Sequence, residues 1–212
     1  MDLELLNIRK DKGQKMSQSD LISCGWTKKM IQDLLPEPEE KKNPVFRRAS
    51  PMKLWNVEDI ENVMVTEAFK EAEIIANKRK ASAVKAIEKR YNDLMQIIDD
   101  KIEEIHVRKL DDDTLRKNTL ISKQNHFADR YELYGGFEMP DESTMNRWVV
   151  NYIRHELTTY DYELYTIAGK VGVHDGYIKY KKAVLYKIAE LYPNYSDECE
   201  RQMSGIKTYQ RY

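Results

Sequence analysis

Apolar residues recur at helical spacing through the middle of this 212-residue chain. Between residues 84 and 105 they step by three and four positions, which places them along one face of a helix: Val84, Ile87, Tyr91, Leu94, Ile98, Ile102 and Ile105. The surrounding stretch contains neither glycine nor proline, and alanine, glutamate, lysine and isoleucine dominate it. The pattern therefore predicts one long helix over about 57–110.

A helix of that length would reach on the order of 75 Å, which is longer than a domain of this size is wide. It must either pair in a coiled coil or break and fold back. We favour a protruding or paired, coiled-coil-like helix, with residues 77–82 as the place where it could break. A basic run along the helix is followed by an acidic run that comprises Asp99, Asp100, Glu103 and Glu104. Two such helices could therefore pair antiparallel, with the basic half of one against the acidic half of the other.

Helical spacing returns in shorter runs over residues 114–200. The apolar positions fall on faces that suit the core of a small bundle: Trp148, Val149, Tyr152, Ile153 and Leu157, then Ala183, Val184, Ile188, Ala189, Leu191 and Tyr192. Gly135-Gly136, residues 169–176 and Pro193 interrupt these runs, and the carboxylates of 111–113 can cap the helix that follows them. The pattern predicts a helical C-terminal domain over 114–200 and a frayed tail over 201–212.

Turn signals at close spacing mark the first part of the chain. Thr27 can cap a short helix over 28–35, which Pro36 ends. Two short extended runs, 45–48 and 52–55, lie on either side of a turn, and this is typical of a hairpin or wing. We predict a flexible lead-in over 1–17 and a small winged-helix-like module over 18–66.

Composition agrees with a mainly α fold that joins this module, the long helix and a C-terminal helical bundle. Gly 8 and Pro 6 are too few for the many tight turns of a β-sandwich. Two cysteines, Cys24 and Cys199, form neither a disulfide framework nor a zinc site, and they suit a reducing, cytoplasmic location. No run approaches the roughly 18 consecutive apolar residues that a membrane span needs, so we expect no membrane partner.

Charge is balanced over the whole chain, with Lys+Arg 35 against Asp+Glu 36, so its local distribution matters more than its total. Cations gather at the start of the short helix and in the wing: Lys28, Lys29, Lys41, Lys42, Arg47, Arg48 and Lys53. Lysine is unfavourable for the dipole of a helix at its N-terminus, but that end suits a phosphate. Adjacent arginines could follow a DNA backbone or reach into its minor groove. The alternative is a solvated charged face, with Trp26 and Trp55 as core anchors rather than base-stacking surfaces.

The same region resembles two DNA-binding families. It resembles the MerR-type winged-helix domain along Asp20-Leu21, Gly25-Trp26-Thr27, Leu34-Leu35-Pro36, Phe46-Arg47-Arg48, Lys53-Leu54-Trp55, Val57 and Ile60. It also resembles the related fold of the XPA nucleotide-excision-repair family along Lys42-Asn43-Pro44 and Met52-Lys53-Leu54-Trp55. Met30-Ile31-Gln32 stands where MerR-type regulators have Arg-Tyr-Tyr, and no cysteine zinc finger precedes the module. The resemblance implies a DNA-binding fold for residues 18–66, and the rest of the chain resembles uncharacterised bacterial proteins that join such a module to a helical domain.

Between residues 70 and 90 the predicted long helix carries many more cations than acids. We select Lys78, Arg79 and Lys85 as candidate phosphate contacts that would extend a DNA-binding track away from the module. The alternative interpretation is the ordinary charged face of an exposed helix. The sequence leaves both interpretations open.

In the C-terminal domain the most distinctive pattern is a polar stripe on one side of a helix: Asn151, Arg154, His155 and Thr158. It could bind a partner, or it could be an internal network that ties the bundle together. His155, His174-Asp175 and Asp197 faintly resemble the metal ligands of HD-type phosphohydrolases, but glycines surround His174-Asp175. We therefore assign no catalytic residue, metal ligand or cofactor.

The sequence leaves two main functional hypotheses. In the first, the chain is a DNA-binding protein with a regulatory, repair or defence role, and its long helix and C-terminal domain bind a protein partner or a second copy. In the second, it is a non-enzymatic adaptor or inhibitor that acts through protein contacts alone. A metal-dependent hydrolase is a third hypothesis. It is the weakest of the three, because the histidines are scattered along the chain without the spacing of metal ligands.

Overall fold

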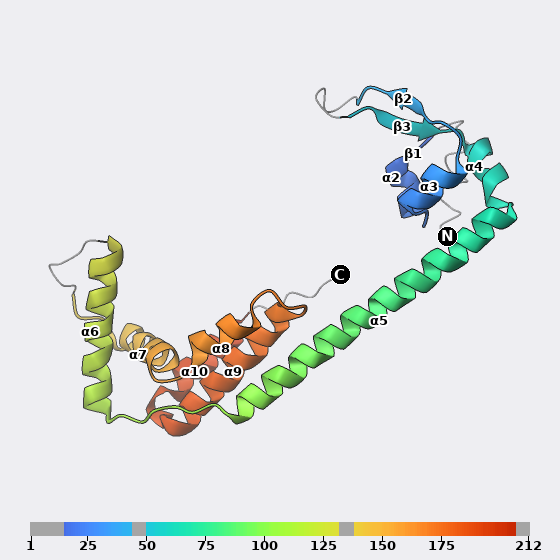
Figure 1. Cartoon of the computed structure of the whole chain (residues 1–212). Coiled ribbons are helices and arrows are strands. Elements are labelled where there is room, and N and C mark those ends of the chain that lie inside the picture. Colours follow the sequence, from blue (N-terminus) through green and yellow to red (C-terminus); the bar gives the residue numbers. More distant parts are fainter. Residues whose placement is uncertain (1–14, 44–49, 132–137, 207–212) are drawn as a thin grey trace. The chain divides into compact units, whose positions relative to one another are not determined.

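The structure is a computed structural model that describes residues 15–43, 50–131 and 138–206 (Figure 1). The described part is mainly helical, as the sequence predicts, and it contains one small three-stranded sheet. The chain divides into two compact units, Met1–Lys85 and Ala86–Tyr212. The longest helix, α5 (Glu67–Glu103), contributes residues to both.

The N-terminal unit combines short helices with an antiparallel sheet. Its strands are β1 (Met16–Ser17), β2 (Glu39–Lys41) and β3 (Met52–Trp55), in the order β1-β3-β2, with Met16 opposite Trp55 and Glu40 opposite Lys53. Its short helices are α2 (Gln18–Ser23), α3 (Lys28–Leu34) and α4 (Val57–Met64). The predicted partner run 45–48 lies outside the described residues, and the described partners of β3 are β1 and β2.

Local sequence signals explain why the short helices of this unit begin where they do. Ser17 and Asp20 form a reciprocal capping box at the start of α2. Thr27 caps α3 as predicted, because its Oγ1 accepts a hydrogen bond from the Met30 amide at 3.1 Å. The predicted lead-in over 1–17 is too long, since Met16 is fully buried and pairs with Trp55 in the sheet.

A core of apolar side chains holds the N-terminal unit together. Trp26 and Phe69 lie with ring centroids 4.7 Å apart, and Leu21 and Ile60 are fully buried beside them. Trp26 and Trp55 are only 2% and 5% exposed, which confirms the interpretation that they are core anchors. Neither indole is available as a base-stacking surface.

The helix predicted over 57–110 begins at Val57 as expected, but its break and its end differ from the prediction. The break falls at residues 65–66, because the Thr66 hydroxyl donates to the Val63 carbonyl at 2.6 Å and accepts from the Phe69 amide at 3.3 Å. Residues 77–82 continue the helix without a break, and the Ser82 hydroxyl bonds back to the Lys78 carbonyl within it. α5 ends at Glu103, beyond which the Arg108 amide donates to the Leu157 carbonyl at 3.0 Å.

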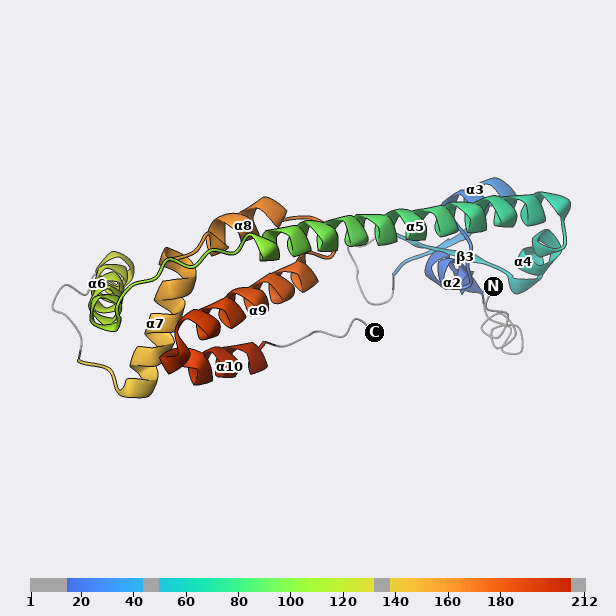
Figure 2. The same ribbon diagram turned by 90° about the horizontal axis from the view of Figure 1, so that it is seen from below.

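The C-terminal unit is a helical bundle around one apolar core. It contains α6 (Asp112–Tyr131), α7 (Glu142–Glu156), α8 (Tyr160–Ile167), α9 (Val173–Leu191), the 3-10 turn η1 (Pro193–Tyr195) and α10 (Ser196–Ser204). Figure 2 shows α9 and α10 side by side. The predicted core positions Val149, Ile153, Val184 and Ile188 are fully buried, and Leu94 and Ile98 of α5 join them. The predicted tail begins too early, because α10 continues to Ser204.

Capping and paired carboxylates make the stability of this unit dependent on pH. A hydrogen bond from the Thr114 amide lowers the pKa of Asp111 below 3.8, and one from the Thr144 amide does the same for Asp141. Hydrogen bonds from Arg116 lower the pKa of Glu142 below its usual 4.5. A carboxylate whose pKa is lower in the folded state than in the unfolded state stabilises the fold at pH values above its unfolded-state pKa. That contribution is lost as the pH falls through the folded-state pKa.

We therefore expect the thermal midpoint of the C-terminal unit to fall as pH is lowered from about 6 to about 3. Glu142→Gln should weaken this dependence, because it removes a carboxylate that Arg116 stabilises in its charged form. Glu103→Gln is the matched control, since Glu103 is exposed and forms no salt bridge with a described residue. A midpoint that stays constant across this range would contradict the prediction.

Candidate nucleic-acid interface

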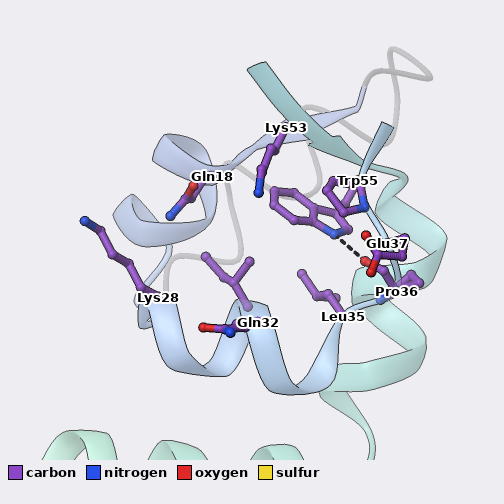
Figure 3. A pocket seen from close by; sticks show the side chains of 10 residues that line it. Gln18, Lys28, Gln32, Leu35, Pro36, Glu37, Lys53 and Trp55 are labelled. Carbon is purple, nitrogen blue, oxygen red and sulfur yellow. Dashed lines mark hydrogen bonds between the residues drawn. The ribbon is translucent and has the colours of Figure 1, made fainter. Parts of the chain in front are cut away.

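A groove on the N-terminal unit gathers polar and cationic side chains between α2, α3 and β3 (Figure 3). Its volume is 460 Å³, and the polar residues along it are Gln18, Lys28, Gln32, Glu37 and Lys53. In the view of Figure 3, Gln18 lies between Lys28 and Lys53. The groove therefore carries two cations, one carboxylate and two amides.

The local sequence explains why these side chains meet. Lys28, Ile31, Gln32 and Leu35 stand at i, i+3, i+4 and i+7, so buried Ile31 and Leu35 lie beside Lys28 and Gln32 on the side of the helix that lines the groove. Pro36 follows α3, and its carbonyl accepts a hydrogen bond of 2.8 Å from Trp55 Nε1. This bond ties the end of α3 to β3 and brings Lys53, two residues before Trp55, to the same groove.

The predicted cations of the module fall into three groups. Lys29 pairs with Asp33 at 2.6 Å, and Lys41 pairs with Glu39 at 3.3 Å. Hydrogen bonds from Lys15 and then Lys41 lower the pKa of Glu39, so that carboxylate stays charged beside them. Lys28, Lys42 and Lys53 are exposed and form no salt bridge with a described residue. Arg47 and Arg48 lie outside the described residues.

The exposed part of α5 carries the densest cationic surface in the described chain. Every residue from 77 to 90 is exposed, and this stretch holds six cations and one acid, Glu88: Lys78, Arg79, Lys80, Lys85, Lys89 and Arg90. None of the six forms a salt bridge with a described residue. At 100° per residue, Lys78, Lys85 and Lys89 fall on one face, whereas Val84 and Ile87 fall on the opposite side.

Lys89 was not among the phosphate contacts selected from the sequence, although its spacing could have identified it. Lys78, Lys85 and Lys89 stand at positions i, i+7 and i+11, which is a single helical face. Arg79 lies on another side of the helix, near Arg90. The structure thus brings Lys78 and Lys85 together with Lys89, while Arg79 belongs to a separate pair.

The predicted polar stripe of the C-terminal unit comes together as an internal network. Arg154 is only 9% exposed, and its guanidinium donates to Asn151 at 3.1 Å and to Gln202 of α10 at 2.9 Å. His155 Nδ1 lies 2.8 Å from the Asp161 carboxylate of α8, and the Thr158 hydroxyl donates to the Arg154 carbonyl. These bonds tie α7 to α8 and α10, as the alternative of an internal network predicts.

Comparison with known proteins gives no family for this chain. No family model, curated protein or solved structure matches it. Within the described residues, three or more histidine, cysteine, aspartate or glutamate side chains nowhere gather as a metal site would require. Nor does any described helix combine the length and apolar character needed to cross a membrane. The surfaces of the chain therefore have to indicate its function.

Proposed function

We propose that this chain binds duplex DNA, with the exposed lysine face of α5 as the principal phosphate contact and the groove on the N-terminal unit as a second contact. One observation carries the proposal: six cations stand against a single acid over 77–90, and no described carboxylate pairs with them. The resemblance of residues 18–66 to MerR-type and XPA-family modules supports it.

Like charges at i, i+4, such as Lys85 and Lys89, destabilise a helix, and neither lysine forms a salt bridge with a described residue. A polyanion would offset this destabilisation. Lys78, Lys85 and Lys89 extend over about 16 Å of helix axis, a length over which duplex DNA presents roughly nine phosphates. Three exposed lysines on one face can therefore each reach a phosphate, and each contact releases a condensed counterion.

The groove on the N-terminal unit adds a polar surface with the same preference for phosphate. Lys28 and Lys53 supply positive charge, and the amides of Gln18 and Gln32 can donate to phosphate or to base edges. Glu37 opposes an anion at its own end of the groove, so the contact would lie on the side of Lys28 and Lys53. Arg47 and Arg48 stay candidate DNA contacts on the sequence alone, because they lie outside the described residues.

Binding of a labelled duplex to the full chain, measured by fluorescence anisotropy between about 50 and 200 mM salt, tests this function. The wild-type chain should lose affinity steeply as salt rises. A triple variant with Lys78→Gln, Lys85→Gln and Lys89→Gln should bind on the order of tenfold or more weakly, and its slope of log K against log salt should be shallower by about 2–3.

The matched control removes three exposed lysines from the C-terminal unit: Lys109→Gln, Lys117→Gln and Lys182→Gln. Net charge changes equally in the two triple variants, so only a local contact distinguishes them. Equal loss of affinity in both would show a non-local charge effect, and it would end the proposal. A wild-type chain that does not bind duplex at low salt would end it as well.

A second candidate function, protein interaction without nucleic acid, has one specific observation in its favour. Val84 and Ile87 are 48% and 52% exposed on the side of α5 away from the lysine face. A partner helix or a second copy could cover them. Light scattering after size exclusion, with and without duplex, separates the two functions. The protein-interaction candidate predicts that the chain associates to the same extent with and without DNA, and that the double variant Val84→Ser, Ile87→Ser no longer associates. Either function suits a cytoplasmic protein, since Cys24 and Cys199 are both buried and are too few for a disulfide framework.

A further inference from the structure

A second polar groove lies in the C-terminal unit, between α6 and α7. Its volume is 420 Å³, within the range of small-molecule sites, and it is lined by Lys123 and His126 of α6, by Trp148 and Arg154 of α7, and by Asp161 of α8. A neighbouring hollow continues it along α6 and shares His126, Tyr152 and Glu156 with it. Aromatic, cationic and hydrogen-bonding groups therefore meet in one place.

Arg154 is a buried cation whose hydrogen-bond partners are all neutral. Its guanidinium donates to Asn151 Oδ1 and Gln202 Oε1, and its Nη2 lies 3.0 Å from His155 Nε2. Because a guanidinium can only donate, His155 Nε2 must accept, and the imidazole proton is then on Nδ1, which faces Asp161. Among the described residues, no carboxylate bonds the guanidinium directly, whereas buried charges are usually paired.

Lys123 also lines this groove and forms no salt bridge with a described residue. Lys123 Nζ lies 5.5 Å above the Trp148 ring, and burial together with nearby Arg147 lowers the pKa of Lys123. Burial together with Arg154 lowers the pKa of Lys181. Five other cations of the unit pair with carboxylates: Lys101, Arg116, Lys179, Lys187 and Arg201. A buried guanidinium and a partly buried ammonium that line the same groove can both donate charge-assisted hydrogen bonds to one anion.

We propose that this groove binds a small organic phosphate with a planar ring, of the nucleoside monophosphate class, with Lys123 and Arg154 as its phosphate ligands. Arg154 Nη1 carries a second N–H beyond its bond to Gln202, and Lys123 supplies a further charge-assisted donor. Tyr152 and His126 also line the groove and could stack on the ring.

Two carboxylates also line the groove, and they narrow the ligand class. Asp161 accepts a hydrogen bond from His155 Nδ1 and keeps its negative charge, so it opposes an anion at its own end of the groove. Glu156 is exposed and would accept hydrogen bonds from hydroxyl or amino groups. A ligand with a phosphate at one end and hydroxyl or amino donors at the other could place the phosphate at the cations and the donors at Glu156. The site is independent of the DNA surface, because none of its residues belongs to that surface.

Isothermal titration of the full chain with AMP, inorganic phosphate and adenosine tests the site. AMP should bind saturably, and phosphate and adenosine should each bind at least about tenfold more weakly. Lys123→Gln should weaken AMP about tenfold, whereas Lys117→Gln, which removes an exposed lysine from the same helix, should leave it unchanged. The triple lysine variant of α5 should bind AMP normally, which separates this site from the DNA surface.

Arg154→Lys is the second variant, because it keeps the charge but loses the planar fork of donors. It should weaken AMP at least about tenfold while circular dichroism stays that of the wild type. If this variant does not fold, Lys123→Gln decides the question alone. Absence of saturable AMP binding, equal affinity for AMP and inorganic phosphate, or unchanged affinity in Lys123→Gln would each overturn the proposal.

Discussion

Replacing Ile98 with alanine should lower the free energy of unfolding of the C-terminal unit by about 4 kcal/mol. Ile98 is fully buried in the core that α5 forms with α7 and α9. The α9 backbone at Gly176 lies against its side chain, so close that an added Cβ there would be 3.4 Å from Ile98 Cγ1. Two helices in such close contact cannot move together to fill the lost volume, and a cavity remains. Urea unfolding, with hydrogen exchange of α9 amides as the probe, measures the loss.

Ile97→Ala is the matched control, since the two isoleucines are neighbours on one helix and undergo the same chemical change. Ile97 is 37% exposed and lines only a shallow surface hollow beside residues 169–171. Its replacement should cost under about 1 kcal/mol, because little buried surface is lost and alanine favours the helix. Comparable losses in the two variants would mean that α5 does not pack on the bundle through the Ile98 face.

The apolar stripe that predicts α5 illustrates what periodicity can and cannot determine. Leu94 and Ile98 are buried, as the stripe implies, yet Val84 and Ile87 continue the same face and are half exposed. Spacing defines a face of a helix, but only the tertiary structure decides where another element covers it. For the same reason the sequence predicted the bundle core around Val149 and Val184 while it did not reveal that α5 completes that core.

The end points of helices were predictable only where one side chain decides them. Thr27 before α3 and Asp111 before α6 were identified, because each cap is a short polar residue next to a clear helical pattern. Thr66 has the same chemistry but stands within a continuous helix-favouring stretch, where the pattern gives no reason to expect a stop. The break there depends on packing of Phe69 against Trp26, which lies 43 residues earlier in the chain (69 − 26).

Within the candidate sites, contacts between residues near in sequence were predictable, whereas contacts between residues distant in sequence were not. The Lys29–Asp33 pair follows from spacing of four residues on a helix, so its reduced value as a phosphate contact could have been foreseen. The meeting of Lys28 with Lys53 depends on the bond between Trp55 and Pro36, and the network of Arg154 depends on Gln202, which is 48 residues away. Sequence spacing along one element cannot reveal such contacts.

Gly172→Ala should destabilise the C-terminal unit by about 3 kcal/mol, for two separate reasons. Gly172 precedes α9 with φ 80° and ψ 8°, in the left-handed region that side chains rarely adopt. A Cβ at this position would also lie 2.5 Å from Cδ2 of the Tyr91 ring of α5, which is closer than real contacts allow. The ring or the α9 start must therefore shift. Urea unfolding at constant temperature measures the combined cost.

Gly169→Ala separates the two contributions, because Gly169 has nearly the same backbone conformation without the steric contact. Its φ is 74°, and an added Cβ would meet no heavy atom within 4 Å. It should therefore cost only the backbone part, about 1 kcal/mol. Pairing Gly172→Ala with Tyr91→Ala should then recover much of the difference, since the ring that blocks the Cβ is gone and the two changes are coupled. Strict additivity of the two substitutions would show that Tyr91 does not pack on Gly172, and the contact between α5 and the start of α9 would have to be abandoned.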